Sequence, residues 1–195
     1  ELAKANGLTV IGGEAVTVGM AGGYIAGGGH SPLSSFYGMA SDQVLAMQVV
    51  LADGRFITAT AKQNPDVFWM LRGGGGSTIG VVTSVTVKAY PKLLTTTVTF
   101  NYTVADAGGA DNFWASIQSY IDNMKAFVDA GTYSYYYLGA SAYMIGTDYP
   151  GSTDYYFRMQ SFVAPNMTIA QTPGTSRSLV QQPGQPRCQL YTMVQ

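Results

Sequence analysis

Two glycine-rich turns are the parts of this sequence whose residue types and spacing could do chemistry. They cover residues 22–29 and residues 73–80. Successive backbone N–H groups in such turns can form a concave anion-binding site without any Lys or Arg side chain. A phosphate-bearing cofactor would suit these turns, and tight turns at close strand crossings would explain them equally well. The residue types leave both interpretations open.

The first turn belongs to a longer stretch, residues 17–31, that is almost free of charge. Flexible linkers pair glycine with polar residues such as Ser, whereas these glycines stand among Val, Met, Tyr and Ile. Glycine adopts φ values that other residues cannot reach and lets the backbone approach a neighbour closely. The stretch is therefore predicted to pass close to a partner, which is either another strand or a bound cofactor.

Several catalytic classes lack the residues they need. His30 is the only histidine and Cys188 the only cysteine, which argues against a zinc site and an internal disulfide framework. A Ser-His-Asp triad would have to use His30, and no Gly-x-Ser-x-Gly elbow lies near it. Neither the Rossmann glycine fingerprint nor the P-loop pattern occurs. Hydrolase chemistry and these two nucleotide-binding folds are therefore disfavoured.

The composition predicts a folded chain without a highly charged partner. Of 195 residues, 47% are apolar and 11% charged, which is ample material for a core. A net charge of −1 gives no electrostatic case for nucleic acid or an anionic membrane. No apolar run approaches the roughly 18 residues of a membrane span. We therefore expect a small-molecule partner, no nucleic acid and no membrane, with the oligomeric state left open.

The first part of the chain is predicted to contain a loop, a hairpin, a helix and a strand. Residues 1–7 resemble the end of a helix closed by glycine, so we expect the chain to be a fragment. Two β-prone runs, 43–51 and 55–60, meet at Asp53-Gly54, a strong hairpin signal. Asn64 is the predicted N-cap of a short helix that begins at Pro65. A long strand, ended by Pro91, is predicted over the residues between 77 and 90.

The second part is predicted to hold a strand, a helix and two aromatic strands. The strand covers residues 94–104, and the helix runs from its cap at Asp111 to Ala130 with apolar residues at a helical period. The aromatic strands cover 132–145 and 153–163 and are joined through residues 148–151. On this strand set, alternating tyrosines are more often packing residues than substrate contacts.

These patterns predict an α+β fold with three parts. Residues 1–91 form the first α+β domain, with its boundary near Lys92, and residues 92–171 form the start of a second, an antiparallel sheet with helices. Residues 172–195 mix Pro, Gln, Ser and Gly without periodicity and are predicted to be disordered.

Spaced motifs resemble one known family. Its first blocks are Thr17-Val18-Gly19-x-x-Gly22-Gly23-x-x-x-Gly27-Gly28-Gly29, Tyr37-Gly38-x-x-x-Asp42-Gln43-Val44 and Val50-x-Ala52-Asp53-Gly54. A more specific block is Asn64-Pro65-Asp66-x-Phe68-Trp69-x-x-Arg72-Gly73-Gly74-Gly75-Gly76-Ser77-x-x-Gly80-Val81-Val82-Thr83. Together they resemble the vanillyl-alcohol oxidase/PCMH superfamily, in particular the berberine-bridge-enzyme-like FAD oxidoreductases of fungi. The similarity covers residues 8–91 and weakens toward Gln171.

The resemblance implies that residues 1–91 are the C-terminal part of a PCMH-type FAD-binding domain and residues 92–171 part of a substrate domain. It also implies that the loop of residues 18–31 runs along the flavin and its pyrophosphate, and that the backbone of residues 80–82 lies near the adenine. Arg72 would shape its turn, and Asp42 would anchor the entry to the first hairpin strand. The implied FAD-binding residues are Thr17, Val18, Gly19, Gly22, Gly23, Tyr24, Gly27, Gly28, Gly29, Gly80, Val81 and Val82.

The sequence departs from the family pattern at two places. Many relatives carry a flavin-linked Cys before the Thr-Val-Gly, where this chain has Ala15 and Val16, so no cysteinyl–flavin bond is expected. Relatives often have a His after the Gly-Gly, where this chain has Tyr24, and His30 is too far along the chain to take that role. No catalytic residue and no metal ligand is assigned, because the family's catalytic segments would lie outside this chain.

The implied function is FAD-dependent oxidation of an alcohol, amine or sugar carbon by hydride transfer to the flavin, with O₂ as acceptor. Such a fragment is expected to bind FAD weakly and to be inactive by itself. The alternatives are a non-catalytic, glycine-rich, secreted binding or structural module, and a module for ATP-like ligands that the missing P-loop disfavours. Two Asn-x-Thr sequons, at Asn101 and Asn166, lead us to expect an extracellular protein.

Overall fold

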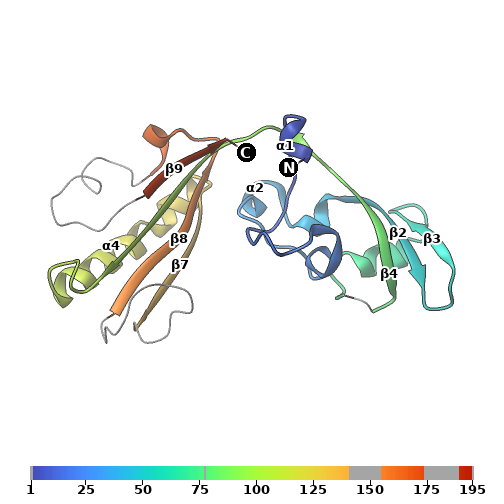
Figure 1. The fold of residues 1–195 in the computed structure, drawn as a ribbon, viewed down its shortest axis with the longest axis horizontal. Helices are drawn as coiled ribbons and strands as arrows, with labels where there is room; N and C mark the ends of the chain where they lie inside the picture. Colours follow the sequence, from blue (N-terminus) through green and yellow to red (C-terminus); the bar gives the residue numbers. More distant parts are fainter. Residues whose placement is uncertain (1, 77, 141–154, 174–188, 195) are drawn as a thin grey trace. The chain divides into compact units, whose positions relative to one another are not determined.

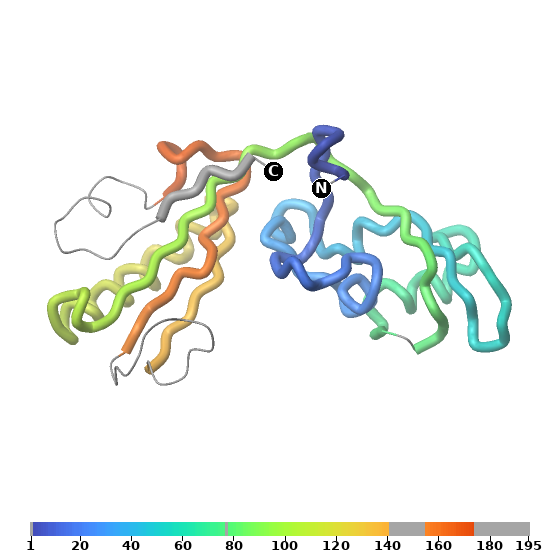
Figure 2. Tube along the Cα trace, viewed as in Figure 1, coloured from blue at the N-terminus to red at the C-terminus, as the bar shows by residue number. Residues whose placement is uncertain are grey.

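The computed structural model describes residues 2–76, 78–140, 155–173 and the backbone of 189–194 (Figures 1 and 2). The chain forms two compact units, Glu1–Leu93 and Leu94–Gln195. Each unit combines antiparallel strands with helices, so the predicted α+β class is confirmed. No helix in the described part of the chain is both long and apolar enough to cross a membrane.

A three-stranded antiparallel sheet organises the first unit. Strand β2 (Val44–Leu51) lies between β3 (Phe56–Ala59) and β4 (Gly80–Val87). The β2–β3 hairpin turns at Gly54, whose φ of 83° favours glycine, and the predicted Asp-Gly hairpin is confirmed. At the start of the unit, α1 (Leu2–Ala5) is followed by β1 (Leu8–Thr9), which pairs with β5 (Tyr90–Pro91).

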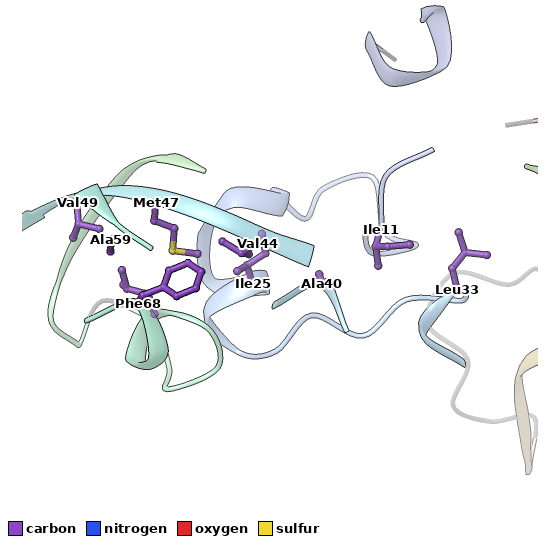
Figure 3. Packing of buried hydrophobic residues seen from close by; sticks show 10 residues of the cluster. Ile11, Ile25, Leu33, Ala40, Val44, Met47, Val49, Ala59 and Phe68 are labelled. Carbon is purple, nitrogen blue, oxygen red and sulfur yellow. The ribbon is translucent and has the colours of Figure 1, made fainter. Parts of the chain in front are cut away.

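The core of the first unit lies between this sheet and the short helix α3 (Pro65–Leu71). Figure 3 shows Phe68 of α3 pointing toward Met47 of β2, with Val49 and Ala59 beside them. All four side chains are almost completely buried. Ile25 of the glycine-rich stretch joins the same cluster, so the loop is fixed to the core through an apolar side chain.

Two details of the first unit differ from the prediction. Asn64 precedes α3, but its side chain does not cap the helix: at φ 49° and ψ 55° its Nδ2 donates to the Thr58 carbonyl oxygen instead (2.8 Å). The predicted strand over 77–90 is shorter, because β4 ends at Val87 and Pro91 belongs to a separate short pair with β1. Proline lacks an N–H group and is tolerated in such short edge pairs.

The second unit is a four-stranded antiparallel sheet with one long helix. The strand order is β7 (Tyr133–Ala140), β8 (Tyr155–Pro165), β6 (Leu94–Thr103) and β9 (Gln189–Val194). Helix α4 (Ala110–Asp129) lies along one face of this sheet (Figure 1). Phe113 and Ile117 of α4 pack against Tyr102 and Phe157 of the sheet. A short 3₁₀ turn, η4 (Ile169–Gln171), follows β8.

The second unit contains the predicted strands and helix, and it corrects two predictions: the N-cap of the helix and the disorder of the last residues. The N-cap of α4 is Gly109, and Asp111 lies in the first turn rather than at the cap. Residues 189–194 form β9 along β6, so the prediction of disorder is wrong for them. Because β9 pairs with a strand far away in sequence, local composition carries no sign of it. The predicted join at 148–151 and tail residues 174–188 lie outside the described residues.

Candidate functional site

The fold brings the two glycine-rich turns together. Gly75 of the second turn donates its backbone N–H to the carbonyl oxygen of Ala26 in the first (2.9 Å). A Cβ atom at Gly76 would lie 3.7 Å from the Cα atom of Gly23. Strand β4, which begins at Gly80, contacts the helical turn η1 (Met20–Tyr24). The turns that the sequence separates by about fifty residues therefore form one surface.

Part of this glycine content is required by the protein's own packing. Gly28 and Gly29 adopt φ values of 100° and 74°, and their carbonyl oxygens accept hydrogen bonds from Ser41 and Ala40. The prediction of φ values that favour glycine is thus confirmed at these two residues. At Gly80, a Cβ would lie 2.5 Å from the carbonyl oxygen of Val50 on β2, so close strand packing excludes a side chain there.

The packing of the chain does not explain a second group of glycines. Four glycines have φ outside the left-handed region and no heavy atom within 4 Å of the place a Cβ would take: Gly12, Gly19, Gly22 and Gly23. No other glycine in the described ranges shares both properties. Gly19, for example, has φ −72° and ψ 126°, an extended conformation open to any residue. All four lie in one short stretch, and their missing side chains leave room for something outside this chain.

Tyr24 holds this loop in shape. Its hydroxyl donates to the carbonyl oxygen of His30 (2.6 Å). Its ring packs 3.3 Å from the Cβ position of Gly13 and 2.9 Å from that of Gly29. Partial burial raises the pKa of the Tyr24 hydroxyl, which keeps it protonated as a donor. His30, which accepts this hydrogen bond through its carbonyl oxygen, is exposed.

Comparison with known proteins identifies the cofactor. Residues 1–60 match the family model described as FAD binding domain. The chain is 45% identical over 145 residues to the FAD-linked oxidoreductase ZEB1 of Gibberella zeae, which covers 74% of this chain and 26% of that protein. Residues 1–60 therefore match the FAD binding domain, the chain is homologous to part of the fungal FAD-linked oxidoreductases, and its cofactor is FAD.

Two solved structures support this assignment. The VAO-type flavoprotein MtVAO615 from Myceliophthora thermophila C1 has a TM-score of 0.75 at 28% identity, covering 99% of this chain and 33% of that one. Berberine bridge enzyme from Eschscholzia californica shares the fold, with a TM-score of 0.57 at 24% identity, covering 84% and 31%. The berberine-bridge-enzyme-like resemblance is confirmed. The chain spans about a quarter to a third of these relatives.

The residues of the chain fit this cofactor. FAD carries a pyrophosphate, and exposed backbone N–H groups without side chains can approach a phosphate closely. Thr17, Val18, Gly19 and the Gly22-Gly23 pair all lie on the exposed stretch that carries the open glycines. Gly12 belongs to the same set but was not among the predicted residues. No motif spacing singles it out, and only the empty space around it does.

The remaining predicted FAD-binding residues differ in their surroundings. Gly27 follows η1 in the chain, and its N–H donates to the Gly23 carbonyl oxygen (2.8 Å). Val81 is exposed on the outer face of β4, whereas Val82 packs against the core on the opposite face. The structure therefore brings the start of β4 beside η1 but turns only Val81 outward.

Arg72 and Asp42 fix the frame of the site. The Nε atom of Arg72 donates to the Ser41 carbonyl oxygen (2.7 Å), and its guanidinium lies 3.7 Å from the Asp42 carboxylate and over the Phe68 ring. Asp42 also accepts the backbone N–H of Met39 (2.9 Å), just before β2. These contacts agree with the predicted structural roles. Among the described residues, no group of three or more His, Cys, Asp or Glu could hold a metal ion.

Proposed function

We propose that the protein of which these units are part oxidises a small molecule at an alcohol, amine or sugar carbon, with O₂ as the final acceptor. When bound, FAD supplies the two-electron acceptor for hydride removal from that carbon. The observation that carries the proposal is the cluster of open glycines, Gly12, Gly19, Gly22 and Gly23, on the surface where the two turns meet.

The chain's own residues would bind and orient the cofactor. The exposed backbone of residues 17–23 offers N–H groups and space, and the hydrogen bond from Tyr24 to His30 keeps that backbone in place. The hydrogen bond from Gly75 to Ala26 holds the second turn against it. We assign no catalytic base within this chain, and we propose that the 195-residue chain alone binds FAD weakly without turning over substrate.

We expect the chain to bind FAD, because open backbone at the joined turns can receive the pyrophosphate. Titrating the chain into FAD should shift the flavin absorbance bands and change the flavin fluorescence to a saturating value. ATP at the same concentration should not reverse the change. The full-length protein, carrying the sequence on both flanks, should be yellow as purified. An unchanged flavin spectrum in both samples would favour the non-catalytic module, and displacement by ATP would favour the ATP-binding module.

We further propose that the protein is secreted, and its two sequons provide a test. Asn166 is exposed in the turn after β8, with φ 59°, whereas Asn101 is half-buried in the middle of β6 between two neighbouring strands. An N-glycan is bulky and requires a surface position. In protein recovered from its source, we expect a glycan on Asn166 and none on Asn101. Enzymatic removal of an N-glycan converts the glycosylated Asn to Asp, and mass spectrometry detects the resulting change in mass. An unmodified Asn166 contradicts the proposal.

A further inference from the structure

Among the helices that the structure describes, α4 covers one face of the second unit's sheet and leaves the other face open. Val98, Phe100 and Tyr102 of β6 point to α4 and pack in its core. Because side chains alternate along a strand, Asn101 points to the opposite side. In the pairing register Asn101 lies opposite Arg158 of β8, and Arg158 lies opposite Tyr137 of β7. These three residues form a cross-strand row in the middle of the face away from α4, which we call the open face.

Arg158 is the positive charge of the open face. It is half-buried, and it makes no hydrogen bond or ion pair with any residue that the structure describes. The other described arginines are paired: Arg55 with Asp53, and Arg72 with Ser41 and Asp42. A half-buried charge without a partner is costly, so an arginine that served only the fold would be expected to have one.

No described carboxylate faces Arg158. The acidic residues of the second unit within the described ranges lie in the β6–α4 turn or on α4, on the other side of the sheet: Asp106, Asp111, Asp122 and Asp129. Lys125, the other described cation of this unit, pairs with Asp129 on that helix. Among the described residues, the open face therefore carries one positive charge without a compensating carboxylate, and an anion would complement it.

Flat aromatic surface lies next to this charge. Tyr135 and Tyr137 are 40% and 37% exposed, their ring centroids are 5.3 Å apart, and the Tyr137 hydroxyl donates to that of Tyr135 (3.1 Å). Tyr136, between them, points to α4 and packs on Tyr120. The alternating tyrosines thus divide: Tyr136 is a core residue, and its two neighbours line the open face.

A buried hydroxyl on the same face also lacks a partner. Ser161 of β8 pairs with Tyr135, so both side chains point to the open face. Its Oγ atom is buried and makes no hydrogen bond, the one such side-chain atom in the described part of the chain. Atoms of the chain itself bury this hydroxyl, so Ser161 lies beside the exposed part of the open face and offers no space to a ligand.

We propose that the open face binds a planar carboxylate, with the carboxylate on the guanidinium of Arg158 and the ring against Tyr135 and Tyr137. Arginine suits this ligand because its planar fork matches a carboxylate with two parallel hydrogen bonds. The site lies wholly in the second unit. It rests on the proposed function only in that the carboxylate would be carried by the substrate that is oxidised.

The test is equilibrium binding of benzoate to the 195-residue chain, by calorimetry, with benzamide as the neutral probe of the same shape. Benzoate should bind at one site and benzamide at least tenfold more weakly. Arg158→Gln should weaken benzoate on the order of 10- to 100-fold, the usual effect of losing hydrogen bonds to a charged group. Arg158→Lys should retain part of the affinity. Lys125→Gln, which removes a paired charge from the far side of the sheet, should leave it unchanged.

Circular dichroism of each variant shows that the sheet remains folded. Equal binding of benzoate and benzamide, no benzoate binding, or an Arg158→Gln variant that binds as the parent does would each overturn the proposal. FAD binding, measured in the same samples, should be the same in Arg158→Gln and the parent. If the parent chain binds benzoate but does not bind FAD, the result would count against the proposed function and not against this site.

Discussion

Replacing Gly29 with alanine should destabilise the first unit by about 2–5 kcal/mol. Two costs add. The φ of 74° at Gly29 is left-handed, which costs an L-residue roughly 1–2 kcal/mol. The new methyl group would also lie 2.6 Å from Cβ of Ala40 and 2.9 Å from the Tyr24 ring, and forcing extra atoms into packed space costs about 1–3 kcal/mol. Urea unfolding, assigned to the first unit by hydrogen exchange of β2, measures the loss.

Neighbouring variants separate the two costs. Gly28→Ala has φ 100° but only an ordinary contact, 3.6 Å to Met39, so it should lose the backbone part alone. In the double variant Gly29→Ala with Ala40→Gly, one of the two crowded methyl groups is absent. Its loss should therefore be smaller than the sum of the single losses, by about 1 kcal/mol or more. Additive losses, or an unchanged midpoint for Gly29→Ala, would show that this packing is wrong.

Replacing Gly23 with alanine should weaken FAD binding at least tenfold while leaving stability within about 0.5 kcal/mol of the parent chain. No atom of the chain lies within 4 Å of the new methyl group, and φ at Gly23 is outside the left-handed region, so the fold has no reason to resist it. The methyl group would occupy the space that we propose FAD uses. Flavin titration measures the affinity, and urea unfolding measures the stability.

A second glycine gives the opposite pattern. Gly54 lies in the β2–β3 turn with φ 83° and open surroundings. Gly54→Ala should therefore lose roughly 1–2 kcal/mol of stability and keep its FAD affinity. If Gly23→Ala and Gly54→Ala have the same effect on FAD, the open glycines are not the cofactor surface. The two variants together separate binding from folding.

The two glycine-rich turns illustrate how far a motif reaches. Their residue types allow a phosphate-bearing cofactor or a purely structural turn, and only the resemblance of the whole motif set to a known family pointed to FAD. Spacing does not say which glycine serves the ligand and which serves the fold. Gly80, assigned to the adenine end, is a glycine because Val50 leaves no room for a side chain. Gly12, absent from the motif, has the same open surroundings as Gly19.

The sequence by itself determined the elements whose causes are local. The Asp53-Gly54 turn, the start of α3 at Pro65 and the period of α4 depend on residues within a few positions of one another. It also pointed to the cofactor, through a family resemblance that rests on motifs each continuous in the chain.

Only the tertiary structure decided what depends on residues far apart in sequence. The pairing of β9 with β6 overturned the predicted disorder of residues 189–194. The hydrogen bond from Gly75 to Ala26 joined two turns into one surface. The strand register placed Arg158 between Asn101 and Tyr137, on a face where none of the described carboxylates lies. The physical reason is the same in each case. Side-chain period and turn chemistry specify a segment, whereas the space around a glycine or the partner of a charge is specified by whichever distant segment packs beside it.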